Sequence, residues 1–120
     1  MVVDALDTLQ SSFAGCDTLA FADLSTQMIL VTNSTTTSPR ETLDALCKEA
    51  ALTLGTKGKI AIGSDKNATA IVAGQDQLRV FIRAVQEPSD VLCCVCQPDI
   101  DVVGFLPAAR ACLEQISGGA

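Results

Sequence analysis

The residues best suited to chemistry in this chain are its six cysteines, because the sequence contains no histidine. Without histidine, mechanisms that need a Ser–His or Cys–His pair, or a histidine bound to a metal, are excluded. A thiolate can still act as a nucleophile, a redox group or a metal ligand. The candidates are Cys16, Cys47, Cys93, Cys94, Cys96 and Cys112.

Three of these cysteines are close together in an apolar segment, residues 91–96. A CxxC turn would favour a metal or redox site, but this segment is typical of a strand. In a strand, Cys94 and Cys96 share one face and Cys93 points to the other. No basic residue nearby in the sequence would lower a thiol pKa. We therefore predict that the cysteines pack as small apolar side chains, with a redox thiol as the alternative.

Two arginines share one face of a predicted strand at residues 78–85. In that strand Arg79, Phe81, Arg83 and Val85 alternate with Val80, Ile82 and Ala84. Arg79 and Arg83 are therefore candidates for binding an acidic partner or a phosphate. The alternative is an ordinary solvated strand face.

A third candidate for chemistry is the segment 55–59, Gly-Thr-Lys-Gly-Lys, which superficially resembles a phosphate-binding loop. It lacks the GxxxxGK[ST] spacing and a strand directly before it. We expect no phosphate site there, and no residue pattern in the chain indicates a catalytic site, a bound metal or another cofactor.

Composition narrows the class of protein. The chain has 120 residues and a formal net charge of −6, with a mass of 12.5 kDa and a pI near 4.3. That length suits one domain, and such an acidic chain is a poor partner for nucleic acid or anionic membranes. No apolar run is long enough for a transmembrane helix, and acids stand where a signal peptide would carry bases. These features predict a cytoplasmic protein without membrane insertion.

The first half of the chain predicts a helix, a hairpin and a second helix. The second helix follows Ser38-Pro39-Arg40-Glu41, a sequence typical of a helix start with a capping box. Small residues in its apolar stripe, which packs either on its own sheet or against another helix, allow a close approach. The predicted elements are a helix at 2–14, strands at 19–24 and 27–32, and a helix at 42–54 with the stripe Leu43, Leu46, Cys47, Ala50, Ala51 and Leu54.

The second half predicts three strands and a final helix, at 68–73, 78–85, 91–96 and about 102–116. Pro107 is tolerated in the first turn of a helix, so that helix should begin near residues 103–104. The segment 56–67 reads as a loop with a brief extended piece at 59–62. We predict a single α+β domain at 1–117 with a flexible tail at 118–120.

The predicted order of elements resembles that of the Roadblock/LC7 family, which has a profilin-like fold. The resemblance covers residues 2–117, and its most specific stretch is residues 90–116: an apolar last strand, a short polar loop and a helix with Arg110 and a terminal Ile116. Family members often begin that helix with Asn-x-Gly, where this chain has Asp101-Val-Val-Gly104. Its segment 56–67 is also longer than usual.

The resemblance implies an α-β-β-α-β-β-β-α fold, in which a five-stranded antiparallel sheet lies between one helix and two others. It also implies a homodimer formed by the third strands and the second helices. An uncovered third strand would otherwise leave an exposed apolar edge. The interface residues implied are Ala68, Ala70, Ile71, Val72, Leu43, Cys47, Ala50 and Leu54.

The resemblance further implies a regulatory or scaffold protein without catalytic activity, because relatives regulate small Ras-like GTPases or serve as light chains of motor complexes. The partners expected are a second copy of the chain and a small GTPase or other protein. A small-molecule-sensing domain is the first alternative, and it would require a cavity with convergent polar groups. A cysteine-based redox protein is the second.

Overall fold

The computed structural model describes residues 2–13, 15–34, 39–54, 69–84, 87 and 89–117, and for Thr53 and Leu54 it describes the backbone alone. The predicted order of elements and the α+β class are confirmed. The elements are α1 (Val2–Ser12), β1 (Cys16–Asp23), β2 (Met28–Thr32), α2 (Arg40–Leu54), β3 (Thr69–Ala73), β4 (Leu78–Arg83), β5 (Asp90–Cys96) and α3 (Val102–Ser117).

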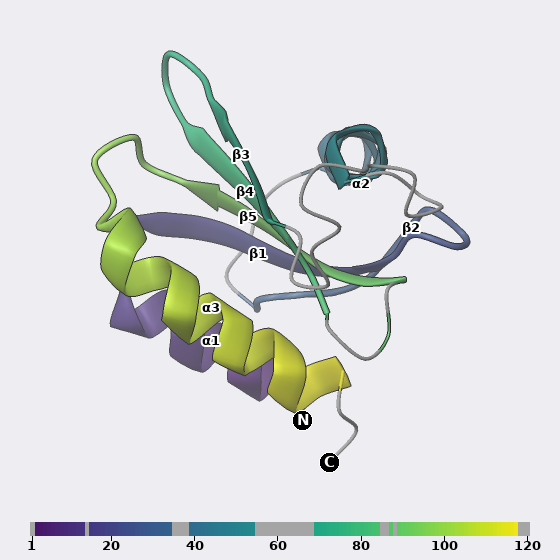
Figure 1. Cartoon of the computed structure of the whole chain (residues 1–120), viewed down its shortest axis with the longest axis horizontal. Helices are drawn as coiled ribbons and strands as arrows, with labels where there is room; N and C mark the ends of the chain where they lie inside the picture. Colours follow the sequence, from purple (N-terminus) through teal and green to yellow (C-terminus); the bar gives the residue numbers. More distant parts are fainter. Residues whose placement is uncertain are drawn as a thin grey trace.

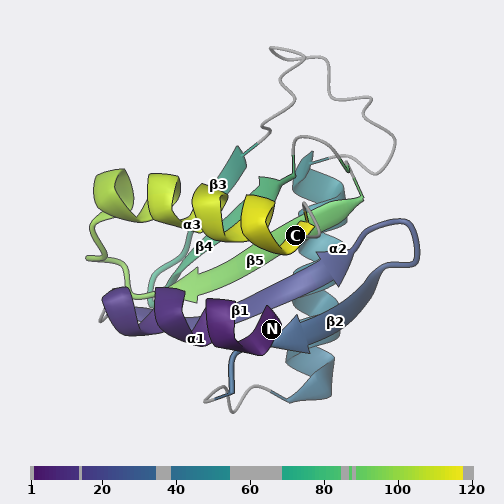
Figure 2. The ribbon, with the colours of Figure 1, turned by 90° about the horizontal axis from the view of Figure 1, so that it is seen from below.

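The five strands form one antiparallel sheet with the order β2-β1-β5-β4-β3 (Figure 2). β5 lies at the centre and is apolar along almost its whole length, as expected for a strand with both faces covered. β2 and β3 are the two edges. The expectation that the third strand lies at an edge of the sheet is therefore confirmed.

Helices cover both faces of the sheet, which gives three layers (Figure 1). α1 and α3 lie side by side on one face, and α2 lies on the other. The residues of β4 alternate between the two cores as predicted: Val80 and Ile82 pack towards α1 and α3, whereas Phe81 packs towards α2. Phe81 and Phe105 are both fully buried, and each contributes roughly 1.5–3 kcal/mol through burial.

Two β-bulges interrupt the pairing of β1. One lies opposite β2, between Phe21 and Ala22, and leaves Leu30 without a partner and 51% exposed. The other lies opposite β5, between Cys16 and Thr18. This second bulge lets β1 begin at Cys16, three residues earlier than the sequence predicts. The β1–β2 turn is completed by Gln27, whose φ is 55°.

The start of α3 differs from the prediction. Asp101 caps the helix, because its Oδ1 accepts a hydrogen bond of 3.2 Å from the Gly104 N–H. The helix therefore begins at Val102, and Pro107 lies in the second turn instead of the first. Proline at that position removes the hydrogen bond to the carbonyl of Val103. Val103 is 85% exposed and Pro107 is also exposed, so the loss falls on the solvent side of the helix.

Several predicted features lie outside the described residues. They are the capping residue Ser38, the segment 55–59, the loop 56–67, Ala68 and the tail 118–120. Within the described part of the chain, no helix combines the length and apolar character needed to cross a bilayer.

Candidate functional site: the edge of β3 and the groove beside α2

The outer edge of β3 is not paired with any strand of the described residues. The Gly74 N–H donates to the Gln77 carbonyl at 2.8 Å and closes the β3–β4 hairpin. Hydrogen-bonded positions alternate along an antiparallel pair, so Ala70 and Val72 bond to β4. Ile71 therefore directs its N–H and C=O away from β4.

The side chains of β3 divide between the two faces of the sheet. Ala70 and Val72 are half-buried and pack towards α2, whereas Ile71 lies on the opposite face and is 46% exposed. Three of the four interface residues predicted in this strand thus lie at the sheet edge. The fourth, Ala68, is outside the described residues.

The stripe predicted on α2 holds the helix on its own sheet. Cys47 and Ala50 are fully buried among side chains of β1, β4 and β5, and Leu43 is half-buried. Cys47 and Ala50 are therefore not available to a second copy of the chain. Leu54 ends the helix, and its side chain is not described.

The outward face of α2 carries other residues, which the sequence reasoning missed. Thr42, Ala45 and Leu52 are exposed, and Leu52 reaches 81%. At 100° per residue, Leu52 lies opposite the centre of the buried stripe. The sequence could have indicated this outward face, because it places a leucine where a helix of a soluble protein normally has a polar residue.

A groove of about 350 Å³ runs between α2 and the neighbouring strands β4 and β5. One wall comes from α2 and includes Thr42, Ala45 and Glu49. The other comes from the sheet and the β3–β4 turn, and it includes Arg79 of β4 and Gln77 of the turn. The groove and the edge of β3 lie on neighbouring parts of the surface, because β3 is the strand next to β4.

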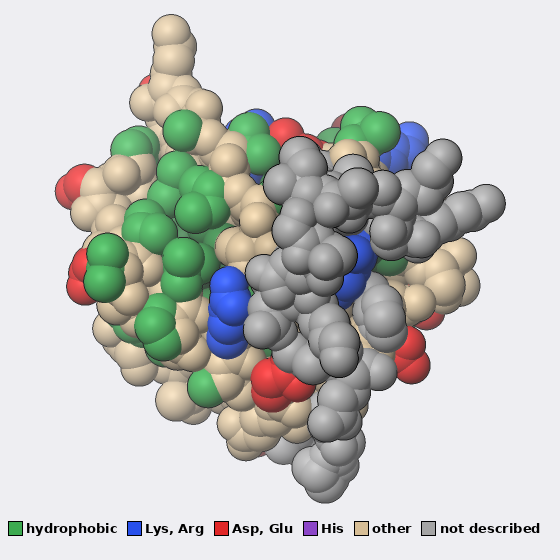
Figure 3. Space-filling view, in the orientation of Figure 1, with side chains coloured by type: hydrophobic (Ala, Val, Ile, Leu, Met, Phe, Trp, Pro, Cys, Tyr) green, Lys and Arg blue, Asp and Glu red, His purple; other side chains and the backbone are tan. Residues whose placement is uncertain are grey.

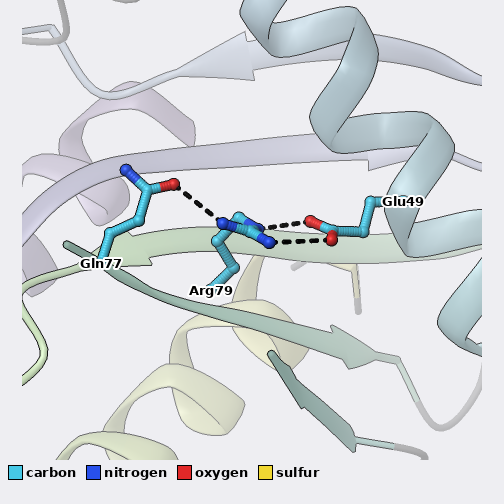
Figure 4. Close-up of polar contacts among 3 residues, drawn as sticks. All are labelled: Glu49, Gln77 and Arg79. Carbon is cyan, nitrogen blue, oxygen red and sulfur yellow. Dashed lines mark hydrogen bonds and ion pairs between the residues drawn. The ribbon is translucent and has the colours of Figure 1, made fainter. Parts of the chain in front are cut away.

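Arg79 is engaged by an ion pair across this groove (Figure 4). Its Nε and Nη2 donate to the two carboxylate oxygens of Glu49 at 2.5 and 3.0 Å, and its Nη1 donates to Gln77 Oε1 at 3.1 Å. Hydrogen bonding to Glu49 raises the pKa of Arg79. The guanidinium thus ties β4 to α2 instead of standing free for an acidic partner.

Arg83 lies four residues further along β4, on the same face. It is only 8% exposed, and its burial lowers the pKa of its guanidinium. The two arginines therefore do not form one exposed basic surface. They also do not lie on a solvated strand face, because α2 packs on this side of the sheet.

The six cysteines are all free and buried, which confirms that they pack as small apolar side chains. Cys94 and Cys96 belong to the core beside α1 and α3, and Cys93 belongs to the core beside α2, as the strand pattern predicted. Burial is the main cause that raises the pKa of Cys47, Cys93, Cys94 and Cys112. No group of three or more metal-ligating side chains gathers in the described ranges.

A second exposed apolar area lies over α3. In Figure 3, hydrophobic side chains gather on the side of the molecule where α3 and the adjoining strands lie. Val103 is the most exposed large apolar residue described, and about one turn further along the helix Leu106 is half-buried and Pro107 is exposed. Arg110, further along the helix, donates to Thr69 Oγ1 and so links α3 to β3.

Comparison with known proteins identifies the fold. No family model matches the sequence, and no curated protein matches it. Solved structures do match. A Roadblock/LC7 domain from Streptomyces avermitilis superposes with a TM-score of 0.78 at 8% identity, covering 95% of this chain and 92% of that one.

Two MglB structures are also similar. MglB from Myxococcus xanthus has a TM-score of 0.74 at 13% identity, with 98% of this chain and 92% of that chain covered. An MglB described as having a tetrameric arrangement has a TM-score of 0.72 at 11% identity, with 98% and 85% covered. The chain therefore has the fold of Roadblock/LC7 domains, and the expected resemblance is confirmed at the level of the fold.

Proposed function

We propose that the protein is a homodimeric regulatory or scaffold protein without catalytic activity, which binds a small Ras-like GTPase in the cytoplasm. The observation that carries this proposal is the edge of β3, which pairs with no strand in the described part of the chain, beside an outward face of α2 that bears Leu52. The Roadblock/LC7 fold supports it, since the resemblance to that family implies self-association and GTPase regulation. The MglB with a tetrameric arrangement is a relative in fold that self-associates.

In the proposed dimer, β3 pairs with β3 of the second copy, and the two α2 helices lie side by side. Ile71 supplies outward backbone groups for the strand pairing, and Ala70 and Val72 lie next to it. Thr42, Ala45 and Leu52, on the outward face of α2, face the second helix. Ala45 is small, which allows the two helices to approach closely. This assigns the helix contact to the outer face of α2 instead of to Cys47 and Ala50.

The absence of catalysis is part of the proposal and is supported by the available side chains. The sequence has no histidine to serve as a base or metal ligand. A catalytic thiol needs an accessible thiolate near neutral pH, and the cysteines are buried. Cysteines that are free and buried in the folded chain also suit a reducing compartment such as the cytoplasm.

For the GTPase we propose the apolar surface over α3 as the contact, centred on Val103. In the dimer, the edge of β3 and the outer face of α2 are covered, whereas Val103 remains on the outside. The partner surface should be neutral or basic, because this chain carries a net charge of −6. Arg79 is a poor anchor for the partner because Glu49 and Gln77 already bind it.

The small-molecule alternative is less well supported. The groove beside α2 has the volume for a small ligand. Its best polar groups, however, bond to one another across the groove. A ligand would have to replace the bonds between Arg79 and Glu49.

Sedimentation of the native chain at micromolar concentration tests the dimer. We expect a species of about twice 12.5 kDa.

Ile71→Pro removes an outward N–H without removing a hydrogen bond to β4, and it should give monomers. Leu52→Asp should also weaken the dimer. Leu30→Asp is the control, because Leu30 is also an exposed leucine, at the opposite edge, and its exposure of 51% is close to the 46% of Ile71. A monomeric wild type would overturn the proposal.

Binding of a Ras-like GTPase from the same organism, loaded with GDP or GTP, tests the second part. We expect the wild-type dimer to bind one nucleotide state more tightly. Val103→Asp should reduce binding at least tenfold while leaving the dimer intact. Equal loss in the Leu30→Asp control, or no binding in either nucleotide state, would count against this partner.

A further inference from the structure

Cys16 and Cys96 are directly opposed where β1 and β5 pair at the end of β5. Leu19 follows Cys16 by three residues in β1. Strict alternation along the strand would place the side chains of Cys16 and Leu19 on opposite faces of the sheet. The bulge between Cys16 and Thr18 shifts the register by one residue. As a result, both thiols belong to the core beside α1 and α3. Two cysteines from different strands thus share one face at opposed positions.

The backbone hydrogen bonds define what kind of pair this is. The Cys16 N–H donates to Phe13 O at 2.9 Å, and the Cys16 carbonyl accepts from Gln10 Nε2 at 3.2 Å. The bond to β5 lies one residue away, where Gln97 N–H donates to Gly15 O at 2.7 Å. Cys16 and Cys96 therefore occupy a non-hydrogen-bonded position. Opposed Cα atoms are about 4.5 Å apart at such positions, within the range that a disulfide spans.

The two thiols also interact. A side-chain hydrogen bond with Cys96 is the main cause that raises the pKa of Cys16, followed by burial. Both side chains are almost fully buried, at 1% and 0% exposure. Since no metal-ligating cluster occurs among the described residues, the contact is not explained as part of a metal centre.

We propose that Cys16 and Cys96 form a dithiol–disulfide site that links β1 to β5. The oxidant is a small disulfide such as oxidised glutathione. One cysteine thiolate attacks it to form a mixed disulfide and releases one glutathione thiol. The second cysteine thiolate then attacks the mixed disulfide, which forms the Sγ–Sγ bond and releases the second glutathione thiol. The two cysteine protons end on the two released thiols, and the protein has lost two electrons to the oxidant.

Burial determines how fast this site reacts. A small disulfide reaches Cys16 only when the start of β1 opens, so oxidation should be slow in the folded protein. Once formed, the bond joins residues that are 80 positions apart (96 − 16 = 80). A link across such a long loop restricts the unfolded chain, so the oxidised form should unfold at a higher temperature.

Peptide mapping of the oxidised full chain tests the site. The folded protein is incubated with oxidised glutathione, its remaining thiols are alkylated, and it is digested with trypsin without reduction. Trypsin isolates Cys16 in peptide 1–40, and it leaves Cys93, Cys94 and Cys96 together in peptide 84–110. We expect a cross-link between these two peptides that dithiothreitol removes. The oxidised protein should also melt at a higher temperature than the reduced one.

Two serine variants identify the thiol in peptide 84–110. Cys96→Ser should lose the cross-link and the rise in melting temperature. Cys94→Ser is the matched control, because Cys94 lies two residues away on the same strand and face, and it should keep both. Circular dichroism checks that each variant is folded. The proposal is overturned if wild type gives only mixed disulfides with glutathione, or if the cross-link survives in Cys96→Ser and disappears in Cys94→Ser.

Discussion

Single side chains fix how α2 sits on the sheet. The carboxylate of Glu49 receives two hydrogen bonds from Arg79, in the planar geometry that suits a guanidinium. Both side chains are less than one-third exposed, at 24% and 29%. The pair is therefore only partly screened by water and is stronger than an ordinary surface ion pair.

Glu49→Gln should destabilise the fold by about 1 kcal/mol, because it replaces a charged, bidentate acceptor with a neutral amide. Urea unfolding at one protein concentration measures the change. Asp44→Asn is the matched control on the same helix. It removes an exposed ion pair with Arg40 of 3.8 Å and should cost less than about 0.5 kcal/mol. If the two variants lose the same free energy of unfolding, the partly buried, bidentate geometry of the Arg79–Glu49 pair adds no stability.

Asp23, at the β1–β2 turn, makes the stability of the fold depend on pH. Its Oδ1 accepts bonds from the Ser25 Oγ at 2.7 Å and the Ser25 N–H at 3.0 Å, and the first of these is the largest cause that lowers the pKa of Asp23. Because folding lowers this pKa, ionised Asp23 stabilises the fold above the pKa of the unfolded chain. That contribution is lost as the pH falls through the folded pKa, below about pH 4.

Ser25→Ala should therefore raise the pKa of Asp23 towards its ordinary value. An NMR titration of the Asp23 carboxyl group measures it directly. Thr26→Ala should raise the pKa by less, because its hydrogen bonds to Asp23 have the smaller effect. A larger shift in Thr26→Ala than in Ser25→Ala would contradict this account of the turn.

At the scale of elements, the start of α3 depends on a close contact between Asp101 and Gly104. A Cβ atom built on Gly104 would lie 2.5 Å from Asp101 Oδ2, which is too close for the cap to remain in place. The sequence has aspartate and an extra residue where the Roadblock/LC7 pattern has Asn-x-Gly, and in the structure the aspartate caps the helix by accepting a hydrogen bond from the Gly104 N–H.

A double-mutant cycle tests this contact. In the wild-type background, Gly104→Ala should destabilise the protein, because losing the cap costs about 1 kcal/mol. In an Asp101→Ala background there is no cap to displace. There the same substitution should stabilise by up to about 1 kcal/mol, since alanine favours a helix over glycine. Unfolding free energies from urea titration would show the reversal of sign, and equal effects in both backgrounds would refute the contact.

The order of elements was predictable because its signals are local. The alternation in β4 and the stripe on α2 each identify one face from residues close in sequence. The bulge at Cys16 was not predictable, because it depends on hydrogen bonds between segments that are far apart in the sequence. The position of Pro107 within α3 was not predictable either, because it depends on the exact first residue of the helix.

The candidate site was predicted less well than the fold. The same apolar stripe fits packing on a sheet or on a second helix, and only the burial of Cys47 and Ala50 separates the two. Likewise, the spacing of Arg79 and Arg83 reveals a shared face but not that α2 covers it. The informative residue was Leu52, an apolar side chain where the pattern calls for a polar one.

At the scale of the whole molecule, the proposed dimer makes stability depend on concentration. Folding coupled to association is favoured by mass action, so the melting temperature should rise as the protein concentration is increased. Ile71→Pro should abolish this dependence, whereas Leu30→Asp should preserve it. Differential scanning calorimetry over a hundredfold concentration range measures the effect, and a constant melting temperature for the wild type would contradict the dimer.

The bulge in the β1–β2 pair bears on how far assembly extends. A dimer joined through β3 would end in two β2 strands, and a flat apolar strand at each end would recruit further copies into an open-ended fibre. The bulge between Phe21 and Ala22 leaves Leu30 out of register with its neighbour. Such an irregular edge is a poor template for another strand. Growth along the sheet would then stop at two copies, which keeps the assembly closed and finite.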